Sequence, residues 1–278
     1  MKVIKISVIM SVYNETIEHL KLSIDSILKQ SFKEFEFIII LDNPKAKNLE
    51  DLIVTYSKND SRIVYIKNNE NIWLASSLNK WIIVSKWKYI ARMDADDISN
   101  EDRLEIQFNY MENNNDIDLL FSWVNYIDNK WHYIKSFCPK KEIIINIKKH
   151  FFKWHYLVHP TLFCKKEILS QNMYNPLFMR TQDYELRLRI ISKYKFDIIE
   201  YNLLEYRIPD ESDINSRINK IKKSTYWAIK ALNTNIKIHI LNLFFWIFYL
   251  KILVMYLTIR MPKKIINFII LINDKLWK

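Results

Sequence analysis

The chain has 278 residues and contains no glycine. Globular proteins average roughly 7% glycine, which would give about 19 in a chain of this length, so chance does not explain the absence. Glycine is the residue that adopts a positive φ without a steric penalty, and other residues must make such turns here. Tryptophan, by contrast, occurs nine times.

Cysteine is also scarce. The two cysteines, Cys138 and Cys164, form neither a disulfide framework nor a metal-ligand spacing, which favours a reducing compartment. The opening run MKVIKISVIM has charges within a short apolar stretch and no cleavage site of small residues. It predicts a strand and not a signal peptide.

Acidic residues are outnumbered by basic ones. Lysine and arginine total 42 against 31 aspartates and glutamates, for a formal net charge of +11. Much of the excess follows residue 215, beside very apolar stretches. A basic surface of this kind suits nucleic acid or an anionic membrane. Because no nucleic-acid-binding motif is present, we expect an anionic membrane surface as a partner and no nucleic acid.

Apolar runs alternate with amphipathic segments along the first hundred residues. The expected strands cover 3–12, 35–41, 63–66 and 89–93, and the expected helices cover 17–30, 47–58 and 74–84. Strands that alternate with helices at this spacing indicate βαβ units and a mostly parallel sheet. Further on, the pattern predicts helices over 103–111 and 183–194 and strands over 117–126 and 161–163. From residue 236 the chain is mostly apolar.

Polar side chains follow three of these strands directly. They are Tyr13-Asn14-Glu15, Asp42 and the run Asp94-Ala95-Asp96-Asp97. Ligands of open α/β sheets bind beyond the carboxyl ends of the strands, so we expect all three sets to face one crevice. Three carboxylates within four residues suit a hard divalent cation, although a helix N-cap followed by acids is the plainer alternative.

Several motifs resemble those of one enzyme family, in the same order and over roughly residues 5–210. They are SVIMSVYNE, the apolar strand ending at Asp42, NIWLASSLN, KYIARMDADD, RLEIQ and QDYELRLR. The chain resembles the inverting, GT-A-type glycosyltransferases of family 2. The resemblance implies a GT-A-like (Rossmann-like) α/β fold, with a mostly parallel sheet flanked by helices. It also implies metal-dependent transfer of a sugar from a nucleotide diphosphate donor, with a UDP-sugar favoured, to an acceptor hydroxyl in cell-surface glycan or polysaccharide synthesis.

The resemblance also implies roles for individual residues. Ser11, Tyr13 and Glu15 match the place where the first strand ends at the nucleotide. Asp42 matches the carboxylate that binds the N–H of the base, usually uracil. Asp94 would contact the ribose or the metal.

The remaining roles concern the metal and the transfer step. Asp96 would bind Mg²⁺ or Mn²⁺, with Asp97 in a supporting position. Asp183 matches the general base, for which a helix N-cap is the plainer alternative. His159 of a His-Pro-Thr segment lies where part of the family has its acceptor side, although a lone histidine is more often structural. Arg92 and Arg103 are weighed as phosphate contacts or ion-paired structural residues.

The expected organisation has two parts. Residues 1–215 form the glycosyltransferase domain, with 1–100 as its nucleotide-binding half and 101–215 as its acceptor half. Residues 216–278 form a basic, apolar helical extension. Within it, 238–259 is expected to associate with a membrane surface, with a buried core helix or a single span as alternatives. A glycan or lipid-linked acceptor would suit a cytoplasmic enzyme held at the inner face of the cell membrane.

Three tryptophans stand where this family usually has glycine. They are Trp73, Trp81 and Trp87, and Trp131 and Trp154 resemble them. Since some lineages read one stop codon as glycine and others as tryptophan, we hypothesise that the chain is a conceptual translation with the wrong genetic code. A different codon at these positions would contradict the hypothesis. A variant with its glycines deliberately removed is the rival. If the tryptophans are genuine, a catalytically degenerate sugar-nucleotide-binding or membrane scaffold protein is the alternative function.

Overall fold

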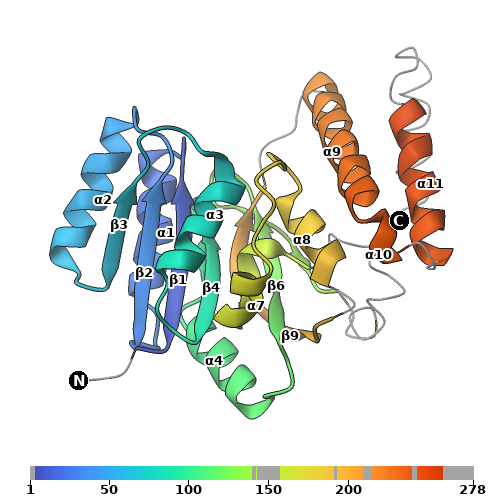
Figure 1. Cartoon of the computed structure of the whole chain (residues 1–278). Helices are drawn as coiled ribbons and strands as arrows, with labels where there is room; N and C mark the ends of the chain where they lie inside the picture. Colours follow the sequence, from blue (N-terminus) through green and yellow to red (C-terminus); the bar gives the residue numbers. More distant parts are fainter. Residues whose placement is uncertain are drawn as a thin grey trace. The chain divides into compact units, whose positions relative to one another are not determined.

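The computed structural model describes residues 4–139, 157–190, 193–208, 214–239 and 243–258, together with Glu142 (Figure 1). Contacts between Cα atoms divide the chain into two compact units, Met1–Asp210 and Glu211–Lys278.

The first half of the first unit is a parallel sheet. Its strands run in the order β3 (Ile63–Lys67), β2 (Phe35–Leu41), β1 (Ile6–Val12) and β4 (Tyr89–Asp94). β1 and β2 are apolar almost throughout because helices cover both of their faces, as is usual for parallel sheets.

The helices divide between the two faces according to the alternation of side chains along the strands. One face packs against α1 (Ile17–Leu28), α2 (Lys47–Asn59) and α4 (Arg103–Asn113). The other packs against α3 (Trp73–Val84), α7 (Lys166–Gln171) and α8 (Gln182–Ile190). The two hydrophobic cores therefore lie on opposite sides of one sheet.

The second half extends the same sheet beyond β4. The order continues with β8 (Phe163–Lys165), β6 (Leu119–Ile127), β9 (Phe196–Arg207) and β5 (Ile98–Ser99), and β7 (Tyr133–Phe137) pairs with β6. The pair β6–β9 is parallel, whereas β8 is antiparallel to both of its neighbours. Since β5 follows the acidic run directly and pairs with β9, that run is held between the ends of β4 and β9.

The predicted α/β class and the mostly parallel sheet are confirmed. Three details differ. β5, β7, α7 and β9 were not predicted, and Thr161 belongs to a short 3₁₀ turn, η2 (His159–Thr161), with the strand starting at Phe163 instead. The predicted helix over 183–194 ends at Ile190, and residues 191–192 lie outside the described part.

The second unit contains α9 (Ile214–Thr234), α10 (Ile236–His239) and α11 (Leu243–Thr258). α9 and α11 contact each other, and the Tyr249 hydroxyl donates to Asn233 Oδ1 at 2.8 Å. Residues 240–242 and 259, part of the predicted segment 238–259, lie outside the described residues. Among the helices that the structure describes, none is long and apolar enough to cross a membrane.

Two of the suspect tryptophans adopt a left-handed backbone conformation. In the described residues, a positive φ occurs at Trp73 (66°), Trp131 (69°) and Thr181 (57°). A bulky side chain in this region is a genuine outlier, and the conformation costs roughly 1–2 kcal/mol for a residue with a Cβ. Backbone geometry thus independently favours glycine at positions 73 and 131.

The other tryptophans are less uniform. Trp81 lies inside α3, almost fully buried, and its Nε1 has no hydrogen-bond partner. The Nε1 of Trp87 is likewise buried and unpaired. An indole N–H usually finds a partner when it is buried, so both sites suit an indole poorly. Trp154 lies outside the described residues.

We predict that Trp73→Gly stabilises the protein. Relief of the left-handed strain should exceed the extra chain entropy of glycine, so the free energy of unfolding should rise by about 1 kcal/mol. Trp246→Gly is the matched control, because position 246 is inside α11, where glycine costs about 1 kcal/mol. Urea denaturation midpoints compare the two. A loss of stability for both variants would show that position 73 does not favour glycine.

Candidate functional site

The acidic run is fixed in place from two sides. The Ser23 hydroxyl of α1 donates to the Asp94 carbonyl at 2.9 Å. From the end of β9, the Arg207 amide donates to Asp97 Oδ1 at 2.8 Å and Arg207 Nε donates to the Asp96 carbonyl at 2.8 Å. One carboxylate oxygen from each of Asp94, Asp96 and Asp97 lies within 4.8 Å of the others.

These carboxylates destabilise one another's charged forms. Burial, together with the charge of Asp94, raises the pKa of Asp96 to about 6. Burial and the charges of Asp94 and Asp96 raise the pKa of Asp97 well above its ordinary value, and Asp97 Oδ2 is buried without a hydrogen-bond partner. A divalent cation would relieve both the repulsion and the unpaired oxygen, and carboxylates are the ligands that Mg²⁺ and Mn²⁺ prefer. The residues present therefore fit such an ion.

The candidate nucleotide-binding residues end adjacent strands. Ser11 of β1 is in register with Asp94 of β4, and β1 and β2 are parallel neighbours. Tyr13 is exposed, and its amide donates to Glu15 Oε2 at 2.7 Å. Burial, and secondarily the charges of Asp96 and Asp94, raise the pKa of Glu15 to about 7.

Asp42 is more deeply buried than the other candidate nucleotide-binding residues. Only 3% of its surface is exposed. Asp42 Oδ1 accepts hydrogen bonds from Asn68 Nδ2 at 2.7 Å and from the Ile72 amide at 3.0 Å. One carboxylate oxygen therefore fixes the loop that leads into α3.

Asp183 lies in the first turn of α8. Its Oδ2 accepts from Arg187 Nη2 at 2.6 Å. Arg187 Nη1 also donates to the Leu157 carbonyl at 2.8 Å, so the pair is anchored to the segment before η2. Thr181, just before α8, has the third positive φ (57°), and strained backbone of this kind is concentrated at functional sites.

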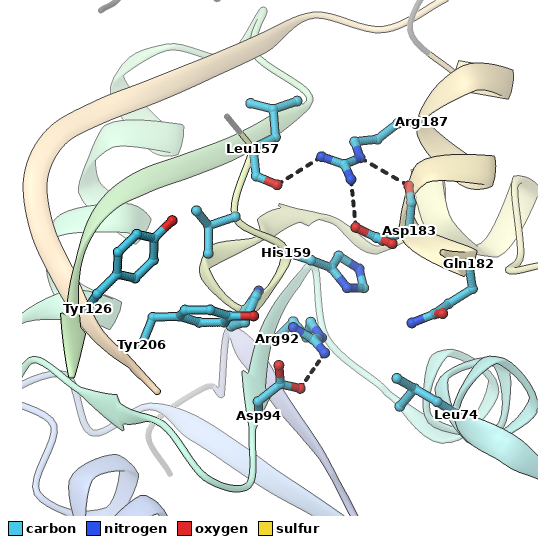
Figure 2. Close-up of a pocket in the computed structure, with 12 residues that line it drawn as sticks. Leu74, Arg92, Asp94, Tyr126, Leu157, His159, Gln182, Asp183, Arg187 and Tyr206 are labelled. Carbon is cyan, nitrogen blue, oxygen red and sulfur yellow. Dashed lines mark hydrogen bonds and ion pairs between the residues drawn. The ribbon is translucent and has the colours of Figure 1, made fainter. Parts of the chain in front are cut away.

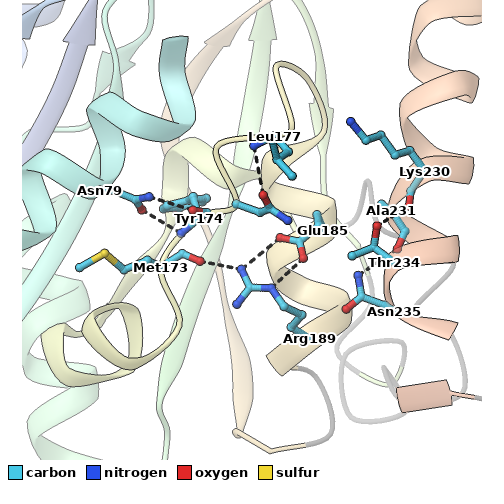
Figure 3. Close-up of polar contacts among 11 residues, drawn as sticks. Asn79, Met173, Tyr174, Leu177, Glu185, Arg189, Lys230, Ala231, Thr234 and Asn235 are labelled. Atoms are coloured by element: carbon cyan, nitrogen blue, oxygen red, sulfur yellow. Dashed lines mark hydrogen bonds and ion pairs between the residues drawn. The ribbon is translucent and has the colours of Figure 1, made fainter. Parts of the chain in front are cut away.

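The segment between α7 and α8 is held by polar contacts from α3 and from α8 (Figure 3). Asn79 of α3 bonds the Tyr174 backbone twice, once to its carbonyl and once to its amide, each at 2.8 Å. Fully buried Glu185 pairs with Arg189 at 2.7 and 3.1 Å, and Arg189 donates to the Met173 carbonyl at 2.7 Å. These contacts position Tyr174, whose hydroxyl bonds His159 Nε2 at 2.7 Å.

His159 is held as a neutral imidazole. Burial, with the positive charges of Arg92 and Arg187 nearby, lowers its pKa well below the ordinary value. A neutral imidazole has one donor nitrogen and one acceptor nitrogen and carries no charge, so Nδ1 remains for a second hydrogen bond. His159 can therefore form a hydrogen bond with a substrate oxygen without forming an ion pair with a nearby carboxylate.

These elements enclose one cavity of about 380 Å³ (Figure 2). That volume is within the ~300–1,000 Å³ typical of small-molecule sites. Its walls include Arg92, Asp94, Tyr126, His159, Asp183 and Tyr206. The structure therefore brings Asp94, His159 and Asp183 together, whereas Ser11, Tyr13, Glu15, Asp42, Asp96 and Asp97 do not line this cavity.

The arginines are the residues that sequence patterns described least well. Arg103 is fully buried and donates to the carbonyls of Arg92 at 2.7 Å and Pro160 at 2.9 Å. It therefore fixes the backbone of two residues that line the cavity. The contacts of Arg187 and Arg207 were not predicted. Arg187 was visible only as one charge on an amphipathic helix, and Arg207 ends a strand that was not predicted.

Comparisons with known proteins agree with this geometry. Residues 7–172 match the family described as glycosyl transferase family 2. The chain is 46% identical over 272 residues to the uncharacterized glycosyltransferase MJ1057 of Methanocaldococcus jannaschii, covering 97% of this chain and 94% of that protein. It is 35% identical to the O-antigen biosynthesis glycosyltransferase WbnJ of Escherichia coli, covering 80% and 86% respectively.

Solved structures show the same fold at low sequence identity. TarS of S. aureus in complex with UDP-GlcNAc superposes with a TM-score of 0.62 at 15% identity, covering 82% of this chain and 66% of that one. The mannosyltransferase PcManGT from Pyrobaculum calidifontis, in complex with GDP-Man and Mn²⁺, gives 0.60 at 12%, covering 85% and 65%. This chain spans slightly less than two thirds of either solved chain.

We predict that His159 makes stability depend on pH. The folded state disfavours the protonated imidazole, so the unfolded state binds the extra proton once the pH falls below the ordinary histidine pKa of about 6.5. Stability should therefore be intact above that pH and fall by at most about 1.4 kcal/mol per pH unit below it. Urea unfolding of the wild type and His159→Gln at pH 7.5 and 5.5 measures this component. Equal pH dependence in both proteins would contradict it.

Proposed function

This chain belongs to glycosyl transferase family 2, and on that premise we propose that it transfers a sugar from a nucleotide diphosphate donor to an acceptor hydroxyl, with inversion and with a divalent cation. The observation that carries the proposal is that Asp94 and Asp183 line the same cavity. A relative in O-antigen biosynthesis supports a role in cell-surface glycan or polysaccharide synthesis.

The acidic run is the proposed metal site. Asp96 would be the direct ligand of Mg²⁺ or Mn²⁺, with Asp94 as second ligand or ribose contact and Asp97 in support. Bound there, the ion would stabilise the charge that develops on the diphosphate leaving group. Asp94 already pairs with Arg92, which favours Asp96 for direct ligation.

A UDP-sugar is the favoured donor. Asp42 would bind the N–H of uracil, with Ser11, Tyr13 and Glu15 around the nucleotide. Solved neighbours in complex with UDP, UDP-GlcNAc and GDP-Man support a nucleotide-sugar donor. In this arrangement residues 1–100 bind the nucleotide, and residues 101–215 contribute His159 and Asp183 to the acceptor side.

Asp183 is the proposed general base. An attacking hydroxyl must lose its proton as the new bond forms, which calls for a positioned carboxylate. The contact with Arg187 fixes the orientation of Asp183 and leaves its Oδ1 for the acceptor. The neutral imidazole of His159, on the same cavity, would position the acceptor or the sugar.

The alternative is a protein that binds a sugar nucleotide without turnover. The observation favouring it is Trp73, half exposed beside Leu74, which lines the cavity. If Trp73 is the natural residue, a bulky indole directly precedes a residue that lines the cavity. Binding of a UDP-sugar without release of UDP, in both the wild type and Trp73→Gly, would favour this alternative.

The second unit is the proposed membrane-binding part. Large apolar side chains at 246, 250, 254 and 257 share one face of α11, and all of them are exposed, as is Ile247. Exposed lysines on the same unit, at 222, 223, 237 and 251, would attract an anionic bilayer by roughly 1 kcal/mol each. Such attachment would bring the enzyme, cytoplasmic and peripheral at the inner membrane face, to a lipid-linked acceptor.

We predict that Asp183→Asn removes most of the transfer activity while substrate binding persists. Loss of a general base should lower kcat about 10²–10⁴-fold. The KM for the donor should change little, because Asp183 acts on the acceptor. Release of UDP in the presence of acceptor measures both constants. Glu167→Gln, an exposed carboxylate of α7, is the matched control and should leave kcat unchanged. A kcat within about threefold of the wild type for Asp183→Asn would exclude Asp183 as the base.

We predict that the protein floats with vesicles that contain anionic lipid and not with neutral ones. Leu250→Glu combined with Val254→Glu should reduce flotation at least fivefold, because it places charge on the apolar face of α11. Ile83→Glu changes a single exposed residue of α3 and is the matched control. Flotation that is unaffected by the double substitution, or equal for neutral vesicles, would exclude this surface.

A further inference from the structure

Arg92 lies on the floor of the cavity. It belongs to β4, two residues before Asp94, and Figure 2 shows its guanidinium between Asp94 and His159. Only 4% of its surface is exposed. The strand holds it in place, because the Arg92 amide donates to the Leu162 carbonyl at 2.9 Å and its carbonyl accepts from Arg103 Nη2 at 2.7 Å. The backbone of Arg92 is therefore fixed where its side chain meets the cavity.

Two of its donors are unused. Arg92 Nη2 pairs with Asp94 Oδ1, but Nε and Nη1 are buried and have no hydrogen-bond partner. A buried unpaired donor costs about 1–3 kcal/mol, and more when the group is charged. By contrast, the neighbouring Arg187 uses Nε, Nη1 and Nη2 in contacts with Asp183 and Leu157. Arg92 is thus a charged residue in a ligand-sized cavity whose donors need acceptors.

The charges around the cavity indicate what those acceptors are. Its two guanidinium groups, Arg92 and Arg187, are each paired with one carboxylate, Asp94 and Asp183. His159 is neutral. The charged groups that line the described cavity therefore balance, and a second anion at Arg92 would be repelled by both carboxylates. Hydroxyl oxygens accept hydrogen bonds without adding charge, so a neutral sugar fits better than a carboxylated one.

We propose that Arg92 binds the transferred sugar, with Nε and Nη1 donating to its hydroxyl oxygens, and that the cavity selects a neutral hexose over a uronate. This inference rests on the proposed function, since the transferred sugar must lie between the metal-bound diphosphate and the base. In the view of Figure 2, Arg92 lies between Asp94 and Asp183, which are assigned to those two ends.

Arg92→Lys tests the contact. Lysine keeps the positive charge beside Asp94 but lacks the planar fork of donors. Calorimetry with Mn²⁺ would measure Kd for UDP, UDP-glucose, UDP-galactose, UDP-GlcNAc and UDP-glucuronate. In the wild type, at least one neutral UDP-sugar should bind more tightly than both UDP and UDP-glucuronate. In Arg92→Lys, the affinity for that sugar nucleotide should fall about 10–100-fold, whereas the Kd for UDP should change less than about threefold.

Several outcomes would overturn the proposal. An equal loss for UDP and the UDP-sugar would place the effect of Arg92 on the nucleotide or metal, and the tightest binding for UDP-glucuronate would reverse the charge argument. If Arg92→Lys does not fold, deoxy analogues of the preferred UDP-sugar, tested on the wild type, supply the second measurement. Undiminished binding of every deoxy analogue would exclude the hydroxyl contacts. If wild-type protein binds no nucleotide at all, the proposed function itself fails.

Discussion

Mutual repulsion among the carboxylates at one edge of the sheet is the constraint on which the site depends. Asp94, Asp96 and Asp97 lie within reach of one ion, and the charges of Asp94 and Asp96 also raise the pKa of Glu15, whose burial is the larger cause. Such a cluster persists only where other groups hold it. The side chains of Ser23 and Arg207 donate hydrogen bonds to its backbone carbonyls, and Arg92 forms an ion pair with Asp94. A cation is the remaining element that the arrangement favours.

The fold brings these groups together over long stretches of chain. β9 runs parallel to β6 and ends at Arg207, beside the acidic run more than a hundred residues earlier in the sequence. β5 completes the connection by pairing with β9 immediately after that run. α8, on the opposite face of the sheet from α1, contributes Asp183. The proposed metal ligands and the proposed base thus come from different parts of the chain, and their separation is set by the sheet.

The sequence predicted the structure of residues 1–100 better than that of residues 101–215. β1, β2 and β4 are mostly apolar, and an acid ends each strand or follows it within three residues, so both the strand pattern and the carboxylates are plain there. β9 was missed because charged residues interrupt FDIIEYNLLEYR and because buried and exposed positions do not alternate regularly along it. Arg207 was missed with it. Pairings such as Arg92–Asp94 or Asn79–Tyr174 depend on tertiary contacts, which no local pattern contains. The glycine-like positions 73 and 131 were suspected from sequence, and their positive φ gives them a physical basis.

The central claim is that the acidic run binds a cation and a nucleotide together. The most direct measurement is the melting temperature of the protein with UDP, with Mn²⁺ and with both, for the wild type and Asp96→Asn. If the acidic run binds both, the two ligands together should raise the wild-type melting temperature more than the sum of their separate effects, and Asp96→Asn should remove this excess. Stabilisation by UDP that is unchanged by EDTA and by Asp96→Asn would contradict a metal-dependent donor site.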